Sequence, residues 1–262
     1  MRKFVGDGQG RTDSGKLRGM AITWHTGEIV ENKIYGHKFR LVKLRVVDDP
    51  GLVFIPGQFV LVRMGRVDKV NDYSPCNIPE PGIIEMLIDI TPADFDPPAG
   101  EGSRFIRDLQ PGDKFEFAGP SGNFVYKLDG ADELWFVATG SGISSLWSIL
   151  RARLMAGEKR RVKLWWGLRH DADVIWEDEL SELSARYPNF SFDYVLSDST
   201  PDWGGKTGHV TEHVLKEAEG LGERKDKVAV YLCGNKGMVE GVSSGLFGLG
   251  ILKERVYWEK YF

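Results

Sequence analysis

Hydrophobic and polar positions follow different patterns in the two halves of the chain. As far as about residue 126, apolar residues occur in short β-rich runs, with turns at Asp49-Pro-Gly51 and Pro79-Glu-Pro-Gly82. The runs cover residues 21–30, 37–47, 58–64, 83–90 and 114–118, and a short helical segment covers 103–109. This pattern predicts an antiparallel β-barrel.

Beyond residue 132 the pattern alternates between apolar runs of strand length and amphipathic segments of helix length. Strands are expected at 134–138, 161–167, 190–196, 228–233 and 255–259, and helices at 143–150, within 175–187, at 209–216 and at 236–246. The alternation predicts a doubly wound parallel sheet. We therefore expect a mobile arm at 1–19, a barrel domain at 20–128 and an α/β domain at 129–262, with polar residues 127–132 as the connector.

The turn Thr139-Gly-Ser-Gly142 joins the first strand of the α/β half to its first helix. Such a turn presents backbone N–H groups at the positive end of a helix dipole, which suits a pyrophosphate. Ser145 stands where the dinucleotide fingerprint has its third glycine, so this segment alone is equally well interpreted as a structural turn.

The ends of the other expected strands carry polar or glycine residues too. They are Gly167-Leu-Arg169, Ser197-Asp198 and Cys233-Gly234-Asn235. Because the carboxyl ends of parallel strands meet at one edge of a sheet, these segments together favour a nucleotide site there.

Composition excludes several classes of function. The net charge of −4 provides no general attraction to nucleic acid or membrane. The two cysteines, Cys76 and Cys233, are too few to ligate an iron–sulfur cluster, so any such centre would lie on a partner. The histidines form no recognisable metal set, and we expect no metal site. With no apolar run long enough to span a bilayer and no apolar signal segment at the N-terminus, the expected location is cytoplasmic.

Six short motifs follow one another along the chain. They are Gly57-Gln-Phe59, Asn71-Asp-Tyr-Ser74, Gly100-Glu-Gly-Ser103, Thr139-Gly-Ser-Gly142, Cys233-Gly-Asn-Lys-Gly-Met238 and Glu259-Lys-Tyr-Phe262. In this order they resemble the ferredoxin–NADP⁺ reductase family, most closely its short bacterial ferredoxin/flavodoxin reductases. In that family a β-barrel binds FAD and a Rossmann-like domain binds NAD(P)H, so the resemblance implies both cofactors and assigns one to each half of the chain.

The resemblance also implies roles for residues in the barrel. Tyr73 is expected to pack on the isoalloxazine, and Ser74 to hydrogen-bond near flavin N5, where hydride arrives. Gly102 and Ser103, at the start of the short helix, are expected to hold the FAD pyrophosphate. The simpler interpretations are an ordinary Tyr-Ser pair in a barrel strand and an N-cap serine.

Further roles fall on the end of the chain and on the α/β half. Cys233 is expected beside nicotinamide C4, although most single cysteines at strand ends are simply buried. Glu259 is expected to relay a proton or orient the nicotinamide, with a surface salt bridge nearly as good an interpretation. We expect Tyr261 to stack on the flavin, with Phe262 as the alternative and groove filling as the simpler role.

The resemblance therefore assigns catalysis to Ser74, Cys233, Glu259 and Tyr261. It assigns cofactor binding to Asn71, Tyr73, Ser74, Gly102, Ser103, Thr139, Gly140, Gly142, Arg169, Ser197, Asp198, Lys206, Gly234, Met238, Tyr261 and Phe262.

Two positions depart from the family's pattern. Asn71 replaces the arginine of the flavin motif, which removes a charge-assisted contact to the FAD pyrophosphate. Asp198 follows Ser197 where NADPH-specific members have arginine, and an acid there favours NADH. Arg169 and Lys206 keep a 2′-phosphate site possible, so both coenzymes stay open, with NADH preferred. The cations that can replace the missing arginine are Arg63, Arg66, Lys69, Arg104 and Arg107.

The resulting hypothesis is a flavoprotein reductase that passes hydride from NAD(P)H to FAD and single electrons to a ferredoxin, a flavodoxin or another iron–sulfur protein. The alternative is a nucleotide-binding subunit, or the reductase component of an oxygenase complex, with little independent turnover. A free-flavin or ferric-siderophore reductase is a third hypothesis. Turnover with an artificial acceptor separates the first hypothesis from the second.

Overall fold

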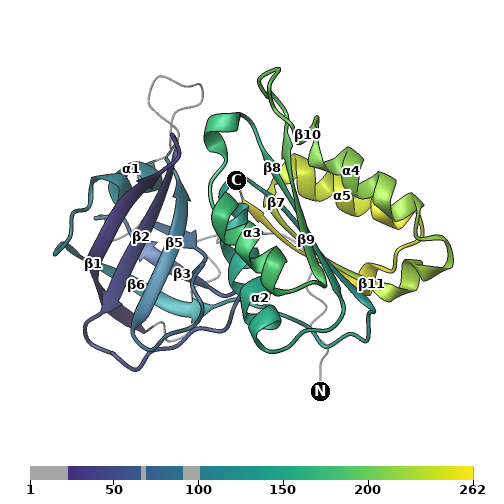
Figure 1. Cartoon of the computed structure of the whole chain (residues 1–262). Helices are drawn as coiled ribbons and strands as arrows, with labels where there is room; N and C mark the ends of the chain where they lie inside the picture. Colours follow the sequence, from purple (N-terminus) through teal and green to yellow (C-terminus); the bar gives the residue numbers. More distant parts are fainter. Residues whose placement is uncertain (1–22, 66–68, 91–100, 262) are drawn as a thin grey trace.

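The chain folds into two units that lie side by side, each built on one β-sheet (Figure 1). The computed structural model describes residues 23–65, 69–90 and 101–261. The arm predicted at 1–19 lies outside the described residues, as do Arg66, Gly100 and Phe262. In the part of the chain that is described, no helix has the length and apolarity needed to cross a membrane.

The first unit is an antiparallel sheet with the strand order β4-β3-β6-β1-β2-β5, rolled into a barrel. Its strands are β1 (Trp24–Tyr35), β2 (Phe39–Val46), β3 (Phe59–Arg63), β4 (Val70–Tyr73), β5 (Ile83–Asp89) and β6 (Lys114–Ser121). The two edge strands come together just after β4, through a bridge between Pro75 and Met86 and a hydrogen bond from Cys76 N to Glu85 O (2.7 Å). Helix α1 (Glu101–Asp108) covers the barrel and contributes Ile106 to its core. The prediction of an antiparallel barrel is confirmed.

Two features of the barrel differ from the sequence prediction. Strand β1 begins at Trp24 and continues to Tyr35, beyond the expected end at residue 30, because its second half pairs with β2 across a tight hairpin. Strand β4 was not predicted, since its four residues carry Asn71 and Asp72 and show little apolar character. Antiparallel pairing with β3 forms this strand in spite of its low propensity.

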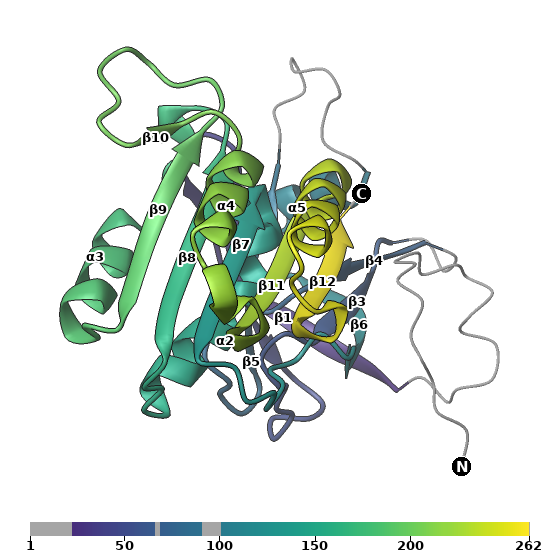
Figure 2. The same cartoon turned by 90° about the vertical axis from the view of Figure 1, so that its right-hand side faces the viewer.

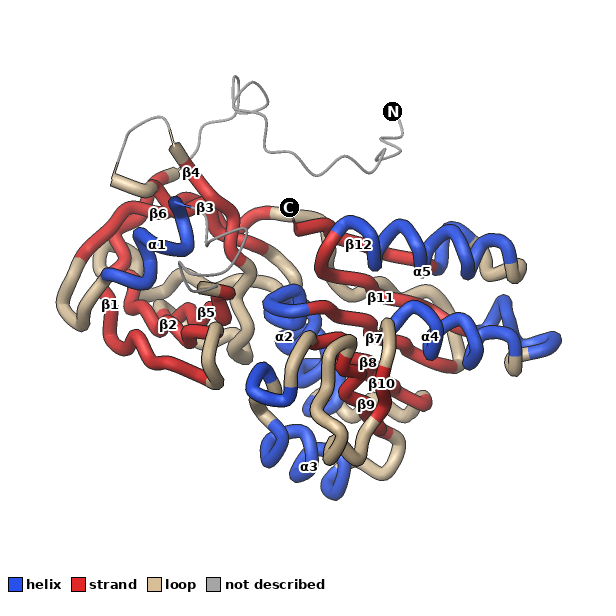
Figure 3. The backbone as a smooth tube through the Cα atoms, turned by 90° about the horizontal axis from the view of Figure 1, so that it is seen from above, coloured by secondary structure: helices blue, strands red, loops and turns tan. Residues whose placement is uncertain are grey.

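The second unit is an all-parallel sheet with the order β10-β9-β8-β7-β11-β12 (Figure 2). Its strands are β7 (Glu133–Thr139), β8 (Arg161–Leu168), β9 (Phe190–Leu196), β10 (Lys206–Thr207), β11 (Val228–Asn235) and β12 (Val256–Tyr261), and its helices are α2 (Ile143–Met155), α3 (Glu177–Arg186), α4 (Val210–Glu219) and α5 (Lys236–Gly248). Helices α2 and α3 cover one face, and α4 and α5 cover the other (Figure 3). The doubly wound prediction is confirmed.

The core on the α2 face of the sheet extends into the barrel. Phe39, Cys76 and Leu87 of the barrel are almost fully buried and pack in the same cluster as Leu146 and Trp166. Hydrogen bonds support this contact, because Leu87 N and Leu87 O both bond to Ser144 Oγ and Ser148 Oγ donates to Asn77 O at 2.8 Å. The two units therefore share a packed interface along α2.

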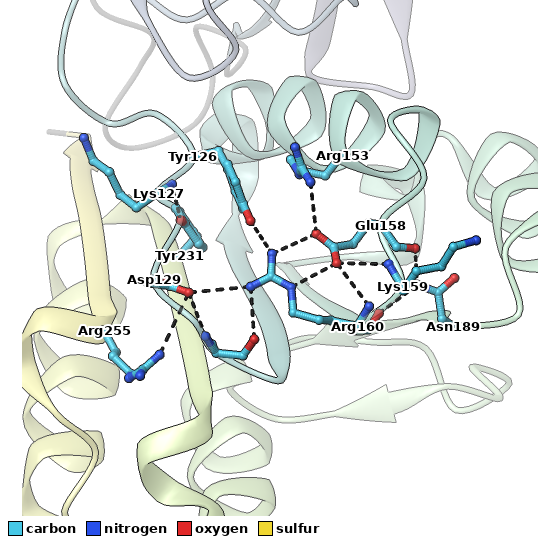
Figure 4. A network of polar contacts seen from close by, with 11 residues as sticks. Tyr126, Lys127, Asp129, Arg153, Glu158, Lys159, Arg160, Asn189, Tyr231 and Arg255 are labelled. Carbon is cyan, nitrogen blue, oxygen red and sulfur yellow. Dashed lines mark hydrogen bonds and ion pairs between the residues drawn. The ribbon is translucent and has the colours of Figure 1, made fainter.

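The polar connector at 127–132 is held by charged side chains (Figure 4). Asp129 ion-pairs with Arg160 (3.5 Å) and accepts a hydrogen bond from the Tyr257 hydroxyl (3.3 Å). Arg160 also binds Glu158 at 2.8 Å, and this hydrogen bond lowers the pKa of Glu158 to about 2. The connector is therefore fixed to the α/β unit by specific pairs.

Candidate functional site

The predicted nucleotide turn is a 3₁₀ turn, Gly140–Gly142, between β7 and α2. Its shape depends on a close approach to the neighbouring strand, because a Cβ at Gly142 would lie 2.4 Å from Cys233 O. The Trp166 indole donates to Gly140 O at 3.0 Å and fixes the turn from the β8 side. No described side chain caps the helix N-terminus that follows, so its first N–H groups are available to an anion.

The end of β11 interlocks with this turn. Gly234 has φ +149°, and a Cβ there would lie 2.1 Å from Thr139 Oγ1. Thr139 Oγ1 accepts hydrogen bonds from Asn235 N (3.0 Å) and Asn235 Nδ2 (3.1 Å), while Asn235 Oδ1 accepts from Met238 N. Four predicted site residues, Thr139, Gly142, Gly234 and Met238, thus lie together at the carboxyl edge of β7 and β11. Asn235 was missed as a site residue, and its place before a helix was the available clue.

The ends of β8 and β9 bring Arg169 and Asp198 together. Asp198 N donates to Arg169 O (2.8 Å), and the two side chains approach to 3.8 Å with both largely exposed. His170 Nδ1 lies 3.0 Å from Asp198 O. Ser197 N donates to Leu168 O, which places Ser197 at the same edge. The arrangement sets a carboxylate and a guanidinium side by side where an adenosine ribose is expected.

Lys206 lies apart from that pair. It is on β10 opposite Val195, and its ammonium group ion-pairs with Asp193 at 2.8 Å. Both residues line a cavity of about 600 Å³ that Trp203 also borders. The predicted contact of Lys206 with a 2′-phosphate therefore requires the lysine to leave Asp193.

The flavin motif places Asn71 and Tyr73 on β4, facing the start of α1. A Cβ at Gly102 would lie 2.0 Å from Asn71 Nδ2, 2.7 Å from Met64 Sδ and 2.8 Å from Tyr73 Oη. Burial raises the pKa of Tyr73 to about 12, so its hydroxyl stays protonated at neutral pH. Ser103 follows Gly102 in the first turn of α1 and is half-buried. These four residues form one group, as the motif implied.

Ser74 and Glu259 meet across the boundary between the two units. Ser74 follows β4, Glu259 lies in β12, and the serine hydroxyl hydrogen-bonds to the carboxyl group. Burial, together with the nearby carboxylate of Asp72, raises the pKa of Glu259 from 4.5 to about 7. Glu259 Oε2 is buried and has no hydrogen-bond partner among the described residues. Asp72 was missed as a site residue, although it stands inside the flavin motif.

Cys233 is completely buried beside these groups, paired with Ala138 on one side and with Glu259 on the other. Its expected contact with nicotinamide stays a prediction. The backbone of Tyr261 ends β12 opposite Asn235, which directs the chain end toward the same edge. The stacking role predicted for Tyr261 and the role of Phe262 concern side chains outside the described residues.

These residues fit the two cofactors that the sequence implies. The approach of α1 to Asn71 and Tyr73 leaves backbone N–H groups for a pyrophosphate, and the buried Glu259 Oε2 provides a polar atom that needs a partner. The glycine turn and the interlocked end of β11 form a second phosphate-sized cradle. Around the described residues no cluster of side chains is arranged to hold a metal ion.

Comparison with known proteins gives the same pairing of domains. Residues 26–126 match the family model described as the oxidoreductase FAD-binding domain, and residues 136–244 match the oxidoreductase NAD-binding domain. Ferredoxin–NADP reductase B of Sorangium cellulosum is 33% identical over 165 residues, which cover 62% of this chain and 68% of that protein. The toluate 1,2-dioxygenase electron transfer component of Pseudomonas putida is 31% identical over 211 residues, or 80% and 59% of the two chains.

Solved structures agree with the fold. The cytochrome P450 reductase GcoB of Amycolatopsis has a TM-score of 0.79 and 25% identity, over 91% of this chain and 70% of that chain. The chain spans about half the length of some curated relatives that it matches, with shares of 51% and 59%.

Proposed function

Because the chain belongs to the ferredoxin–NADP⁺ reductase family, we propose that it is an FAD-dependent oxidoreductase that takes hydride from NAD(P)H and delivers single electrons to a protein carrier. The observation that carries this proposal is the meeting of Ser74 and Glu259, one from each unit, beside Tyr73 and Cys233. Bound FAD supplies the chemistry, since it accepts a hydride and releases electrons one at a time.

The residues of the chain supply binding, orientation and electrostatics. Tyr73, with its protonated hydroxyl, offers a buried aromatic face, and Gly102 brings the N-terminus of α1 close to it. Ser74 donates its hydroxyl hydrogen to Glu259 and keeps the carboxyl oriented. The packed interface along α2 holds the two cofactor sites at a constant separation.

Asn71 leaves the FAD pyrophosphate without the family's arginine. Among the cations proposed to replace it, Arg63 ion-pairs with Glu116 and Arg107 ion-pairs with Asp108. Arg104 is exposed in the first turn of α1, next to Ser103. We therefore favour Arg104 as the cation that attracts the FAD phosphates.

NADH is the proposed coenzyme, because the Asp198 carboxylate repels a 2′-phosphate and its pairing occupies Arg169. Asp198→Asn is expected to lower the ratio of kcat/KM for NADH to kcat/KM for NADPH about tenfold, since it removes the repulsion and frees Arg169. Steady-state kinetics with both coenzymes measures the ratio. Asp202→Asn, an exposed position in the same segment, is the matched control, and an equal change in both variants would contradict the assignment.

The electron acceptor is proposed from chemistry and from relatives. A ferredoxin, a flavodoxin or an oxygenase iron–sulfur protein fits a chain with two cysteines, both buried, because the cluster then lies on the partner. Relatives named as an electron transfer component and as a ferredoxin–NADP reductase support both kinds of acceptor. The alternative, a subunit with little turnover of its own, is favoured by Asn71 alone. The boundaries at 20–128 and 129–262 and a cytoplasmic location stay proposals.

An anaerobic titration tests the proposed function. The purified protein, supplied with FAD, is titrated with NADH and separately with NADPH while the visible spectrum is recorded. Bleaching of the flavin bands by NADH at lower concentration than by NADPH is the expected result. A protein that takes up no FAD, or whose bound flavin neither coenzyme reduces, would overturn the reductase proposal in favour of the binding subunit.

A further inference from the structure

The hairpin turn between β1 and β2 of the barrel lies against the α/β unit. Gly36, in this turn, has φ +58°, and a Cβ there would lie 2.8 Å from Ala172 O and 3.1 Å from the Ile175 side chain. Only glycine permits both this backbone conformation and this approach. The turn therefore touches the 3₁₀ segment Asp171–Asp173 that follows the predicted coenzyme residue Arg169.

A buried carboxylate joins the two units at this contact. Asp173 is completely buried, and its Oδ2 accepts hydrogen bonds from the backbone N–H groups of Arg169 (3.2 Å) and His170 (3.1 Å). From the barrel, His37 Nδ1 lies 3.0 Å from Asp173 Oδ1, and Lys38 Nζ lies 3.6 Å from Oδ2. The segment that carries Arg169 is thus anchored to two barrel side chains.

Lys38 contacts a second carboxylate, Asp89, at 3.3 Å. Asp89 ends β5 beside the nucleotide turn, since its Oδ2 lies 3.8 Å from the Cβ position of Gly140. One ammonium group, largely shielded from solvent, therefore lies between the carboxylates that adjoin the two loops of the predicted coenzyme site.

We propose that His37 and Lys38 are positioning residues for the nicotinamide coenzyme, because through Asp173 and Asp89 they hold the Arg169–His170 segment and the Gly140 turn in register. This inference rests on the proposed function. Without Lys38 the two carboxylates face each other with less compensation, and the buried Asp173 loses its nearest full positive charge. The coenzyme loops then separate, while the FAD residues at Tyr73 and Gly102 lie on the other side of the barrel strands and keep their contacts.

The matched pair Lys38→Met and Lys43→Met tests the proposal on the FAD-loaded full chain with an artificial electron acceptor. Both lysines lie at β2 and pair with an acid of β5, since Lys43 binds Glu85 at 3.0 Å. Lys38→Met is expected to raise KM for NADH about tenfold, with kcat changed less than about twofold and bound FAD unchanged, because misplaced loops weaken binding before chemistry. Lys43→Met is expected to leave KM and kcat unchanged.

Two further variants separate positioning from general damage. Lys38→Arg keeps the charge and is expected to restore KM to the wild-type range. Lys38→Met combined with Asp173→Asn is expected to raise KM less than the sum of the single effects, because it removes the buried charge together with its partner. Equal KM values for Lys38→Met and Lys43→Met would overturn the inference while leaving the reductase function in place.

His37→Asn decides the question if Lys38→Met does not fold. It removes the ring contact with Asp173 and leaves both carboxylates paired with Lys38, so a smaller rise in KM is expected. A wild-type KM for NADH in this variant would then overturn the proposal. Absence of flavin reduction in the wild-type protein would instead reject the proposed function itself.

Discussion

Gly102→Ala is expected to lower FAD affinity by about tenfold to hundredfold and to leave the fold intact. The added Cβ would lie 2.0 Å from Asn71 Nδ2 and 2.8 Å from Tyr73 Oη, so both side chains must move. They are ends of flexible or rotatable groups, and the barrel core does not have to open. Their new positions, however, displace the aromatic face and the start of α1 that the flavin requires.

Flavin fluorescence during titration of the apoprotein with FAD measures the affinity, and thermal unfolding of the same sample measures the fold. Gly248→Ala is the matched control, because Gly248 is an exposed residue of α5 with no atom within 4 Å of its Cβ position. Alanine is expected to be neutral or slightly stabilising there. Unchanged FAD affinity in Gly102→Ala would show that the group around Asn71 and Tyr73 does not hold the flavin.

The sequence contained enough information for the architecture because each half of the chain has its own periodicity. Strand β7 is buried on both faces, as expected for a central parallel strand, and its continuous apolar run identified it. The carboxyl-edge argument placed Thr139 and Gly234 together before any coordinates, and the structure interlocks them. Local pattern and a rule of sheet topology were sufficient for these features.

Contacts between the two units could not be predicted in this way. Nothing in the neighbourhood of Ser74 in the sequence indicates that its partner is Glu259, since the pairing depends on how the barrel packs against β12. The contacts of Lys38 with Asp173 depend on the same packing, and the sequence around Asp173 suggests only an acidic residue before a helix. Lys206 illustrates the opposite error, because a plausible phosphate ligand by position is paired with Asp193. Burial and charge pairing across domains are properties of the folded chain.

Glu259→Gln is expected to remove a pH dependence of flavin reduction that is centred near pH 7. Burial and the neighbouring Asp72 raise the pKa of Glu259 from 4.5 to about 7, so the wild-type carboxyl loses its charge within the physiological range. A hydride brings negative charge to the site, and an ionised Glu259 opposes its arrival. The reduction rate of the wild-type protein should therefore fall about tenfold as the pH rises from 6 to 8.

Stability provides a second measurement with its own sign. The folded state of the apoprotein holds the Glu259 proton to a higher pH than the unfolded state does, so this group's contribution is fully present below about pH 4.5 and is lost as the pH rises through 7. The loss is on the order of 3 kcal/mol. Denaturant unfolding at pH 5 and pH 8 should show a smaller difference for Glu259→Gln than for the wild type.

Glutamine imitates the neutral carboxyl, so Glu259→Gln should reduce flavin at the low-pH rate of the wild type over the whole range. Glu240→Gln is the matched control, because Glu240 is an exposed acid that pairs with Lys260, the residue next to Glu259, at 3.0 Å. Its pH profile should keep the midpoint near 7. A midpoint retained in Glu259→Gln would assign the titration to another group and would remove Glu259 from the reaction, leaving Ser74 to orient the flavin without this carboxyl.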